Sequence, residues 1–483
     1  MQTLRRGFFI GTFLILSLST GVYVQAQRGT AAHDPGIRAG KVDAGKPLAT
    51  LTNDQLQFFL DGQSRFAQVD SVSGTAPGEP GTGLGPTFNS NSCASCHAQP
   101  SMGGTSPSAS QYPNVGPNPQ VAVATDYGAA NTLPSFIALD GPVREVRFPF
   151  AVSTNGNITQ TPDGGVHDIF TIQGRQDATN ATGVWSASQT CTMAQPNYEQ
   201  MAKLENTIFR IPTPVFGAGL IENISDATIL ANMNANAGLK QALGISGHPN
   251  LSGNDGSIMR FGWKAQNKSL EVFAGEAYNV EMGVTNELFP DERANAPASC
   301  MFNKTPEDLT NFNLSSDQIP SDIVAFANFM RFLAAPQPSS DGIPGNPTPQ
   351  SIRNGQAIFG QLHCDTCHTP ALQTNLSSFT LALSNQSAAL FSDLLVHHMG
   401  SGLADRISQG SAGPDEFRTA PLWGLGQRIF FLHDGRATPS NGGLLMAIEQ
   451  HASPGSEANR VIALFNALGD EAKQDLLNFL RSL

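Results

Sequence analysis

Two short strings in this chain place a pair of cysteines directly before a histidine, in the form Cys-x-x-Cys-His. The residues are Cys93, Cys96 and His97 in the first string, and Cys364, Cys367 and His368 in the second. This spacing is the attachment signature of c-type haem, in which the thiols bond the haem vinyl groups and the histidine ligates the iron. The alternatives are redox-active dithiols or a zinc site. Because four of the six cysteines fall in these strings, we expect two covalently attached haems.

The first 26 residues have the features of an export signal. Arg5-Arg6 precedes an apolar run from Phe8 to about Leu18, and Val24-Gln25-Ala26 offers a small-residue cleavage site. We expect cleavage after Ala26 and a periplasmic mature protein, with no membrane span after cleavage. An uncleaved membrane anchor is the alternative, although Phe8–Val24 is slightly short for a span.

The composition is acidic and rich in loop-forming residues. Removing residues 1–26 takes away two arginines and no acidic residue, which changes the formal charge from −12 to −14. Such a charge argues against binding to nucleic acid or to anionic membranes, and it suits docking of a basic redox partner. The 48 glycines and 32 prolines indicate long loops, and the chain length indicates two or more structural units.

Cys191 and Cys300 lie outside the two haem strings. An oxidising compartment favours their pairing. We therefore expect a disulfide between them, although the sequence alone does not show that they are close in space.

We expect a mainly α-helical fold with long loops and some short strands, built from two cytochrome c-like haem domains. A Pro/Ser/Gly-rich linker at 336–349 separates an N-terminal haem domain, 27–335, from a C-terminal cytochrome c-like domain, 350–483. The N-terminal domain carries a large insertion at about 100–250, which we interpret as loops with short strands.

Each domain is expected to begin and end with a helix that packs on its partner. In the C-terminal domain, Thr348 and Pro349 can begin a helix that leads into Cys364, and Leu468–Leu483 is amphipathic. In the N-terminal domain the expected helices are 53–66 and 321–333. The inward residues are predicted to be Leu56, Phe59 and Leu60 in the first, and Ile323, Phe326, Ala327, Met330 and Leu333 in the second. Phe88 and Phe359, each five residues before a haem string, are expected to correspond.

A second repeat supports a duplication. Phe209–Gly217 and Phe417–Gly424 each place Phe-Arg before a proline-containing turn and an aromatic-Gly pair. The economical interpretation is two related domains, the first with an insertion.

Several strings together resemble the di-haem oxidoreductase family, whose members are often labelled thiol oxidoreductases. The family is related to the bacterial di-haem cytochrome c peroxidases. The strings are Gly83–Asn89, Ser92–His97, Asp140–Phe148, Phe216–Glu222, Arg260–Ala265, Asp393–Gly400, Glu416–Gly424 and Phe431–Ala437. They extend over nearly the whole mature chain. The long insertion at about 100–250 is more than an electron carrier needs, and it favours an enzyme.

The resemblance also implies roles for two residues outside the haem strings. Trp263 resembles the tryptophan between the haems of the peroxidases, and Glu281 resembles their distal acid–base carboxylate. Phe273 stands ten residues after Trp263, near the place where the relatives have a glutamine. A distal carboxylate can take a proton from one peroxide oxygen and deliver it to the other. The alternatives are a core tryptophan and a surface glutamate.

The second axial ligands decide which haem can react. The peroxidase relatives place a methionine shortly after the His-Asp-Gly string that begins here at His433; in this chain His451 occupies that region. We expect His451 to be the sixth ligand of the C-terminal haem, with Met399 as rival and His397 or an open position as further alternatives. No histidine follows His97 until His167, which predicts an open N-terminal haem.

Three functions remain open at this level. The first is a peroxidase-like enzyme with the N-terminal haem reactive and the C-terminal haem transferring electrons from a small cytochrome c or cupredoxin to hydrogen peroxide. The second is an electron carrier without substrate, and the third is a haem-dependent oxygenase or substrate oxidase. The relatives also make a calcium ion between the domains conceivable.

Overall fold

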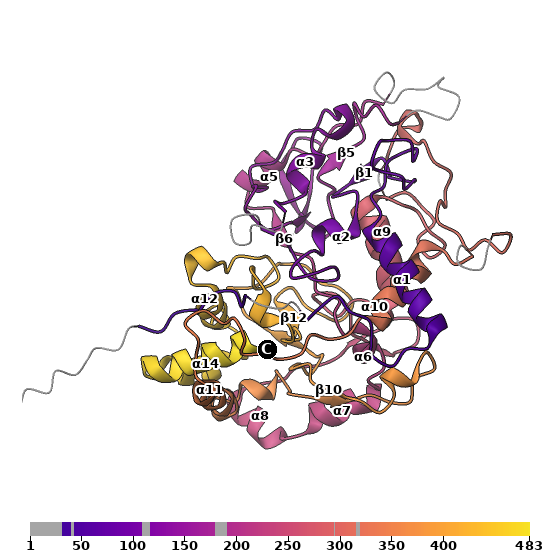
Figure 1. Cartoon of the computed structure of the whole chain (residues 1–483). Coiled ribbons are helices and arrows are strands. Elements are labelled where there is room, and N and C mark those ends of the chain that lie inside the picture. Colours follow the sequence, from indigo (N-terminus) through magenta and orange to yellow (C-terminus); the bar gives the residue numbers. More distant parts are fainter. Residues whose placement is uncertain (1–30, 40–42, 109–115, 179–190, 294, 315–318) are drawn as a thin grey trace, which may run out of the picture. The chain divides into compact units, whose positions relative to one another are not determined.

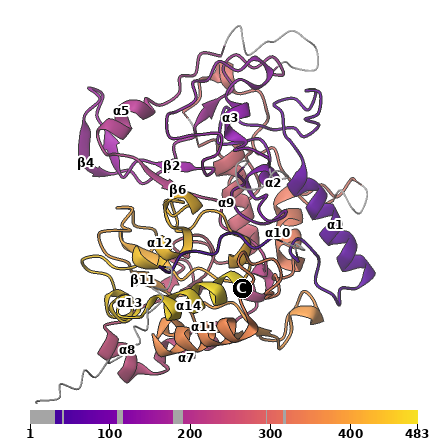
Figure 2. The ribbon, with the colours of Figure 1, turned by 60° about the vertical axis from the view of Figure 1, so that its left-hand side comes forward.

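The computed structural model describes residues 31–39, 43–108, 116–178, 191–293, 295–314 and 319–483. Residues 32–483 form one compact unit (Figures 1 and 2). The predicted signal segment and its cleavage site at Ala26 lie outside the described residues, as do parts of the predicted insertion. None of the described helices is long and apolar enough to cross a membrane.

The described part of the chain is mostly helical, with short two-stranded sheets. Its helices are α1 Asn53–Ala67, α2 Cys93–Cys96, α3 Gln120–Val123, α5 Tyr198–Lys203, α6 Ala218–Glu222, α7 Asp226–Asn234, α8 Ala237–Leu243, α9 Leu270–Met282, α10 Asp322–Phe332, α11 Pro349–Gln361, α12 Gly443–Glu449, α13 Asn459–Asn466 and α14 Asp470–Ser482. Its strands are β1 Thr87–Phe88, β2 Glu145–Arg147, β3 Phe150–Val152, β4 Ile158–Pro162, β5 Phe170–Thr171, β6 Ile208–Arg210, β7 Asn250–Leu251, β8 Ile258–Met259, β9 Leu372–Gln373, β10 Ser387–Ala388, β11 Val396–His398 and β12 Glu416–Arg418. The antiparallel pairs are β1–β5, β2–β6, β3–β4, β7–β8, β9–β10 and β11–β12.

In the C-terminal part, α11 packs along α14 (Figure 2). Thr348 caps α11 by accepting a hydrogen bond from the Ser351 N–H, and Pro349 is the first helical residue, as predicted. The two helices approach closely at Gly355, where an added Cβ atom would lie 2.0 Å from the carbonyl oxygen of Asp475. This close approach is the reason why a glycine is needed in the middle of a helix.

The same arrangement recurs in the N-terminal part, where α1 packs on α10. A Cβ atom added at Gly62 would lie 2.2 Å from the carbonyl oxygen of Ala325. The predicted inward residues of α10 are all buried, and Phe59 of α1 is buried as well. The prediction for Leu60 is wrong, because that side chain is 44% exposed; the face of α1 that meets α10 is formed by Phe59, Gly62 and Phe66 instead.

The repeat seen in the sequence folds as two similar units. Phe209 and Arg210 lie in β6, which pairs with β2, and Phe417 and Arg418 lie in β12, which pairs with β11. Gly217 and Gly424 follow these strands, and both adopt positive φ values, of 64° and 71°. Two haem-binding domains related by duplication remain a prediction that this repeat supports.

The predicted insertion at about 100–250 contains more helix than expected, since α3, α5, α6, α7 and α8 lie in it beside short strands. The predicted disulfide between Cys191 and Cys300 is confirmed.

Within the predicted linker, residues 336–348 have no helix or strand, yet Ile343 is buried. The segment therefore runs along the fold rather than away from it.

Candidate haem sites

The first Cys-x-x-Cys-His string forms one wall of a cavity in the N-terminal part. Cys93 and Cys96 lie one turn apart in α2, and both face this cavity together with His97. Nδ1 of His97 lies 3.0 Å from the carbonyl oxygen of Gly104. Since a carbonyl can only accept, Nδ1 carries the proton and Nε2 keeps a lone pair. Burial lowers the pKa of His97 to about 4, which keeps the ring neutral.

The second string has the same geometry in a separate cavity. Cys364, Cys367 and His368 line it, and the His368 N–H donates to the Cys364 carbonyl as the His97 N–H donates to that of Cys93. Nδ1 of His368 lies 3.0 Å from the carbonyl oxygen of Phe391. Burial, with the nearby His451 ring, lowers the pKa of His368 to about 4. Both histidines are therefore prepared to ligate a metal through Nε2.

An aromatic ring contacts each of these histidines. The Phe359 ring lies 6.3 Å from that of His368, and the Phe66 ring lies 5.9 Å from that of His97. The expected correspondence between Phe88 and Phe359 is therefore wrong. Because α1 ends well before Cys93 whereas α11 leads directly into Cys364, the equivalent ring comes from α1, and Phe88 packs on Phe170 instead.

His451 and Met399 both face the cavity of the second string. His451 follows α12, and its Nδ1 lies 2.7 Å from the carbonyl oxygen of Ala447. Its Nε2 is therefore the atom with a free lone pair, as in His368. Burial lowers the pKa of His451, so its ring is also held neutral. His451 thus has the tautomer that a second axial ligand requires.

His397 has a different environment. Its Nε2 lies 2.9 Å from Asp393 Oδ2 and its Nδ1 lies 2.7 Å from Glu457 Oε2, so both ring nitrogens face carboxylates. Burial opposes its charged form, but the Cys367 sulfur and the Asp393 carboxylate outweigh it and raise the pKa of His397 well above its usual value. A protonated ring with both nitrogens occupied has no lone pair for iron.

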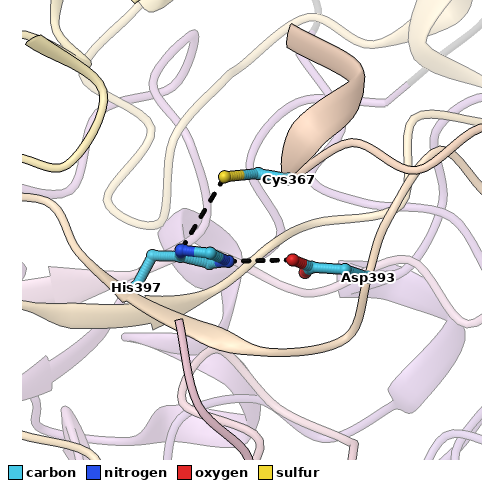
Figure 3. A group of neighbouring side chains, drawn as sticks. All are labelled: Cys367, Asp393 and His397. Carbon is cyan, nitrogen blue, oxygen red and sulfur yellow. Dashed lines mark hydrogen bonds and ion pairs between the residues drawn. The ribbon is translucent and has the colours of Figure 1, made fainter. Parts of the chain in front are cut away.

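Cys367, Asp393 and His397 also form the one group of three metal-capable side chains found among the described residues (Figure 3). Sγ of Cys367 lies 3.7 Å from Nδ1 of His397. The Cys367 thiol belongs to the Cys-x-x-Cys-His string, and the imidazole is held between two carboxylates. We therefore interpret this cluster as a buried charged group beside the second cavity rather than as a separate metal site.

Glu281, in the last turn of α9, faces the cavity of the first string. The Asn89 side-chain amide donates to Glu281 Oε2 over 2.9 Å, and the backbone N–H groups of Asn89 and Ser90 donate to the Glu281 carbonyl. Burial raises the pKa of Glu281 well above its usual value, and the neighbouring Glu145 carboxylate raises it further. The alternative of a surface glutamate does not fit this position.

Arginines surround both cavities, and some of their nitrogen atoms have no protein partner. Arg144 and Arg210 line the first cavity, and each has a buried Nε without a hydrogen bond. Arg418 and Arg428 line the second, and Nη1 of Arg418 is likewise unpartnered. Burial lowers the pKa of both to about 10, so they remain cationic at neutral pH. Unpartnered buried donors of this kind suit an anionic group such as a haem propionate.

Trp263 lies between the two cavities and lines both of them. The indole Nε1–H donates to the Ile211 carbonyl over 2.9 Å, and the Ile211 N–H donates to the His433 carbonyl. The Arg418 N–H donates to the Trp263 carbonyl. The indole is thus bonded beside the first Phe-Arg repeat, and the Trp263 backbone is bonded to the second.

The residues present fit two c-type haems. Each cavity offers two cysteines outside any disulfide, a neutral histidine with Nε2 free, and cationic side chains for the propionates. The second cavity has a further neutral histidine, His451. Of the described residues that line the first cavity, His97 is the one histidine, and Met282 and Met330 are the methionines.

Sequence reasoning missed Glu145 and Arg147 as site residues. Both side chains come from β2, where alternate residues share one face, and both line the first cavity. Both lie in the string Asp140–Phe148, which carries part of the family resemblance without assigning a role to this charged pair. Acidic and basic residues alternating on a short strand were the signal that could have found them.

Comparison with known proteins identifies the family. Residues 159–483 match the family described as "Di-haem oxidoreductase, putative peroxidase". This range includes the second haem string, Trp263 and Glu281. No curated protein matches the chain.

Two solved structures are similar at low identity. One is the hydrazine synthase of Kuenenia stuttgartiensis pressurised with xenon, with 13% identity, 98% of this chain and 100% of that chain covered, and a TM-score of 0.31. The other is a MauG-like protein associated with microbial copper homeostasis, with 15% identity, 49% and 76% covered, and a TM-score of 0.26. The family match, which extends over more than half of the chain, shows that this protein belongs to the di-haem oxidoreductase family.

Proposed function

We propose that this di-haem oxidoreductase is an exported peroxidase that reduces hydrogen peroxide at the N-terminal haem with electrons received through the C-terminal haem. When bound, the two c-type haems supply the redox chemistry. The protein's own residues decide which iron stays open, where protons are held and how the two centres communicate. The observation that carries the proposal is the difference between the cavities that meet at Trp263.

The C-terminal cavity is arranged for electron transfer. His368 and His451 both present a neutral ring with Nε2 free, and a centre closed by two histidines does not bind substrate. The rival ligand Met399 also lines the cavity, so the choice between His451 and Met399 is part of the proposal.

The N-terminal cavity is arranged for reaction. His97 is its one histidine among the described residues, and the wall also carries the carboxyl groups of Glu281 and Glu145. A carboxyl group beside an open iron can move a proton between the two oxygens of bound peroxide. A pure electron carrier needs neither the carboxyl groups nor an open cavity.

Trp263 is proposed to carry electrons between the two centres, because one indole borders both cavities. The donor would be a small redox protein such as a cytochrome c or cupredoxin, for which a negatively charged chain is a suitable partner. The Cys191–Cys300 disulfide fits an oxidising, periplasmic location.

The proposal is tested by following the oxidation of a reduced small cytochrome c after adding hydrogen peroxide to the haem-loaded protein. We expect two donor molecules oxidised per peroxide consumed. The variant C93A/C96A should keep the C-terminal haem and lose turnover, whereas C191A/C300A should keep both haems. Peroxide-independent oxidation of an organic substrate would favour the oxidase alternative. No reaction with peroxide would leave an electron carrier.

A further inference from the structure

A second glutamate stands beside Glu281 in the N-terminal cavity. Glu145 lies in β2 and Glu281 in α9, so the two come from distant parts of the sequence, and the fold brings them close enough for each carboxyl group to shift the pKa of the other. Both line the cavity that holds Cys93, Cys96 and His97. Two neighbouring carboxyl groups in one buried cavity do not both ionise readily, and the pair therefore tends to hold one proton.

The surroundings of the pair determine where that proton lies. Arg147 forms an ion pair with Glu145, and Arg210 stands directly opposite Glu145 in the β2–β6 register. Burial opposes ionisation of Glu145, but the charges of these two arginines outweigh it and lower its pKa. Glu281 instead accepts from the uncharged Asn89 amide.

The other charged groups near the pair are already paired elsewhere. Asp168, which disfavours ionisation of Glu281, is ion-paired with Arg293. Arg210 also contacts Asp405 over 2.7 Å, so it is shared between two carboxylates. The Glu276 carboxylate, which helps to raise the pKa of Arg147, accepts a hydrogen bond from the Asn267 side-chain amide. Arg147 acts on both carboxyl groups, but its ion pair is with Glu145, so the nearest cations stabilise negative charge on Glu145 more than on Glu281.

We propose that Glu145 and Glu281 divide the acid–base work of the N-terminal site, with Glu145 as the base and Glu281 as the acid. This rests on the proposed function, because it requires an open coordination position in the N-terminal cavity. A neutral Glu281 alone could donate a proton but could not accept one. The ionised Glu145 beside it supplies the missing base.

The number of protons held by Glu145 and Glu281 is the same before and after peroxide is cleaved. Glu145 would accept the proton of one peroxide oxygen, while Glu281 would give its proton to the other oxygen, which leaves as water when the O–O bond breaks. The pair then holds one proton, as it did at the start. Two electrons from the small redox partner and two protons from solvent complete the reduction to a second water.

Cyanide binding tests the base without turnover. Hydrogen cyanide is neutral, binds ferric haem as the anion and must leave its proton with a group in the cavity. At pH 7 we expect E145Q to slow cyanide association by at least about tenfold, as loss of a general base does. E281Q keeps Glu145 and should stay within about threefold of the wild type. E307Q is the matched control, because burial raises the pKa of Glu307 to about 8 and yet Glu307 does not line the cavity.

Infrared difference spectra give a second readout that does not depend on ligand binding. A protonated-carboxyl band present in the wild type at pH 8 should be lost in E281Q, and in E145Q it should disappear at a lower pH, because the neighbouring negative charge is gone. Urea unfolding of all variants verifies that they fold.

These measurements distinguish the role of Glu145 as a base from the open coordination position of the N-terminal haem. Normal cyanide association in E145Q, with an unshifted carboxyl band, would overturn the assignment of Glu145 while leaving the open haem intact. A wild type that binds no cyanide would overturn the proposed open haem, and the infrared titration would then decide the proton-sharing pair by itself.

Discussion

The rings of Trp263 and His433 lie edge to face, with their centroids 6.4 Å apart. The Phe417 ring stacks on the His433 imidazole, with the two centroids 4.2 Å apart. His433 is buried and faces the second cavity. Trp263, His433 and Phe417 therefore form a continuous run of ring contacts along the wall of the second cavity.

Replacing Trp263 by Phe should slow electron transfer between the two haems without preventing haem attachment. The substitution removes the hydrogen bond to the Ile211 carbonyl, which costs about 1 kcal/mol of stability. Stopped-flow reduction by a cytochrome donor should show a normal C-terminal phase and a slower N-terminal phase. W423F, in the second aromatic-Gly pair, is the control. Equal N-terminal rates in W263F and the wild type would exclude the bridging role.

Replacing His451 by Ala should convert the C-terminal haem from low-spin to high-spin, because the second neutral imidazole of that cavity is lost. M399A should leave the ferric spectrum unchanged. If M399A changes the ferric spectrum and H451A does not, Met399 is the sixth ligand of the C-terminal haem.

Alanine at Gly62 or Gly355 should destabilise the protein by about 1–3 kcal/mol or more, because the new methyl group would overlap backbone atoms of the facing helix. Gly238 in α8 has open space around it, and G238A should stay within about 1 kcal/mol of the wild type. Urea unfolding of the three variants measures the difference. A G355A variant as stable as G238A would show that α11 and α14 do not cross at this glycine.

Asp70 makes stability depend on pH. Burial raises its pKa from 3.8 to about 7, and the hydroxyl of Tyr278 lies 3.1 Å from its carboxyl group. Because the folded-state pKa is the higher one, its contribution is full below about pH 4 and is lost as the pH rises through 7. D70N should flatten the fall in stability between about pH 4 and 7 by up to about 1.4 kcal/mol per pH unit. The exposed D470N variant should keep the wild-type slope, and a steeper fall in D70N would contradict the assignment.

Local sequence signals were reliable where neighbouring residues determine the structure. Thr348 and Pro349 predicted the start of α11 because capping needs only the first turn of a helix. The Cys-x-x-Cys-His strings placed their thiols and histidines on one wall because five consecutive residues fix that geometry.

Signals that depend on tertiary packing were less reliable. Leu60 had the helical spacing of an inward residue, but α1 turns Gly62 toward α10 and leaves Leu60 exposed. The pairing of Glu145 with Glu281 joins a strand and a helix that only the complete fold brings together, so no local pattern could predict it. The helices α3 and α5–α8 are too short for the sequence pattern to predict them.

The electron paramagnetic resonance spectrum of the oxidised, haem-loaded protein reports whether the N-terminal haem is open and the C-terminal haem closed. We expect one high-spin ferric signal from the N-terminal haem, which shifts on adding cyanide, and one low-spin signal from the C-terminal haem, which does not. Two low-spin signals that are unchanged by cyanide and by peroxide would contradict it.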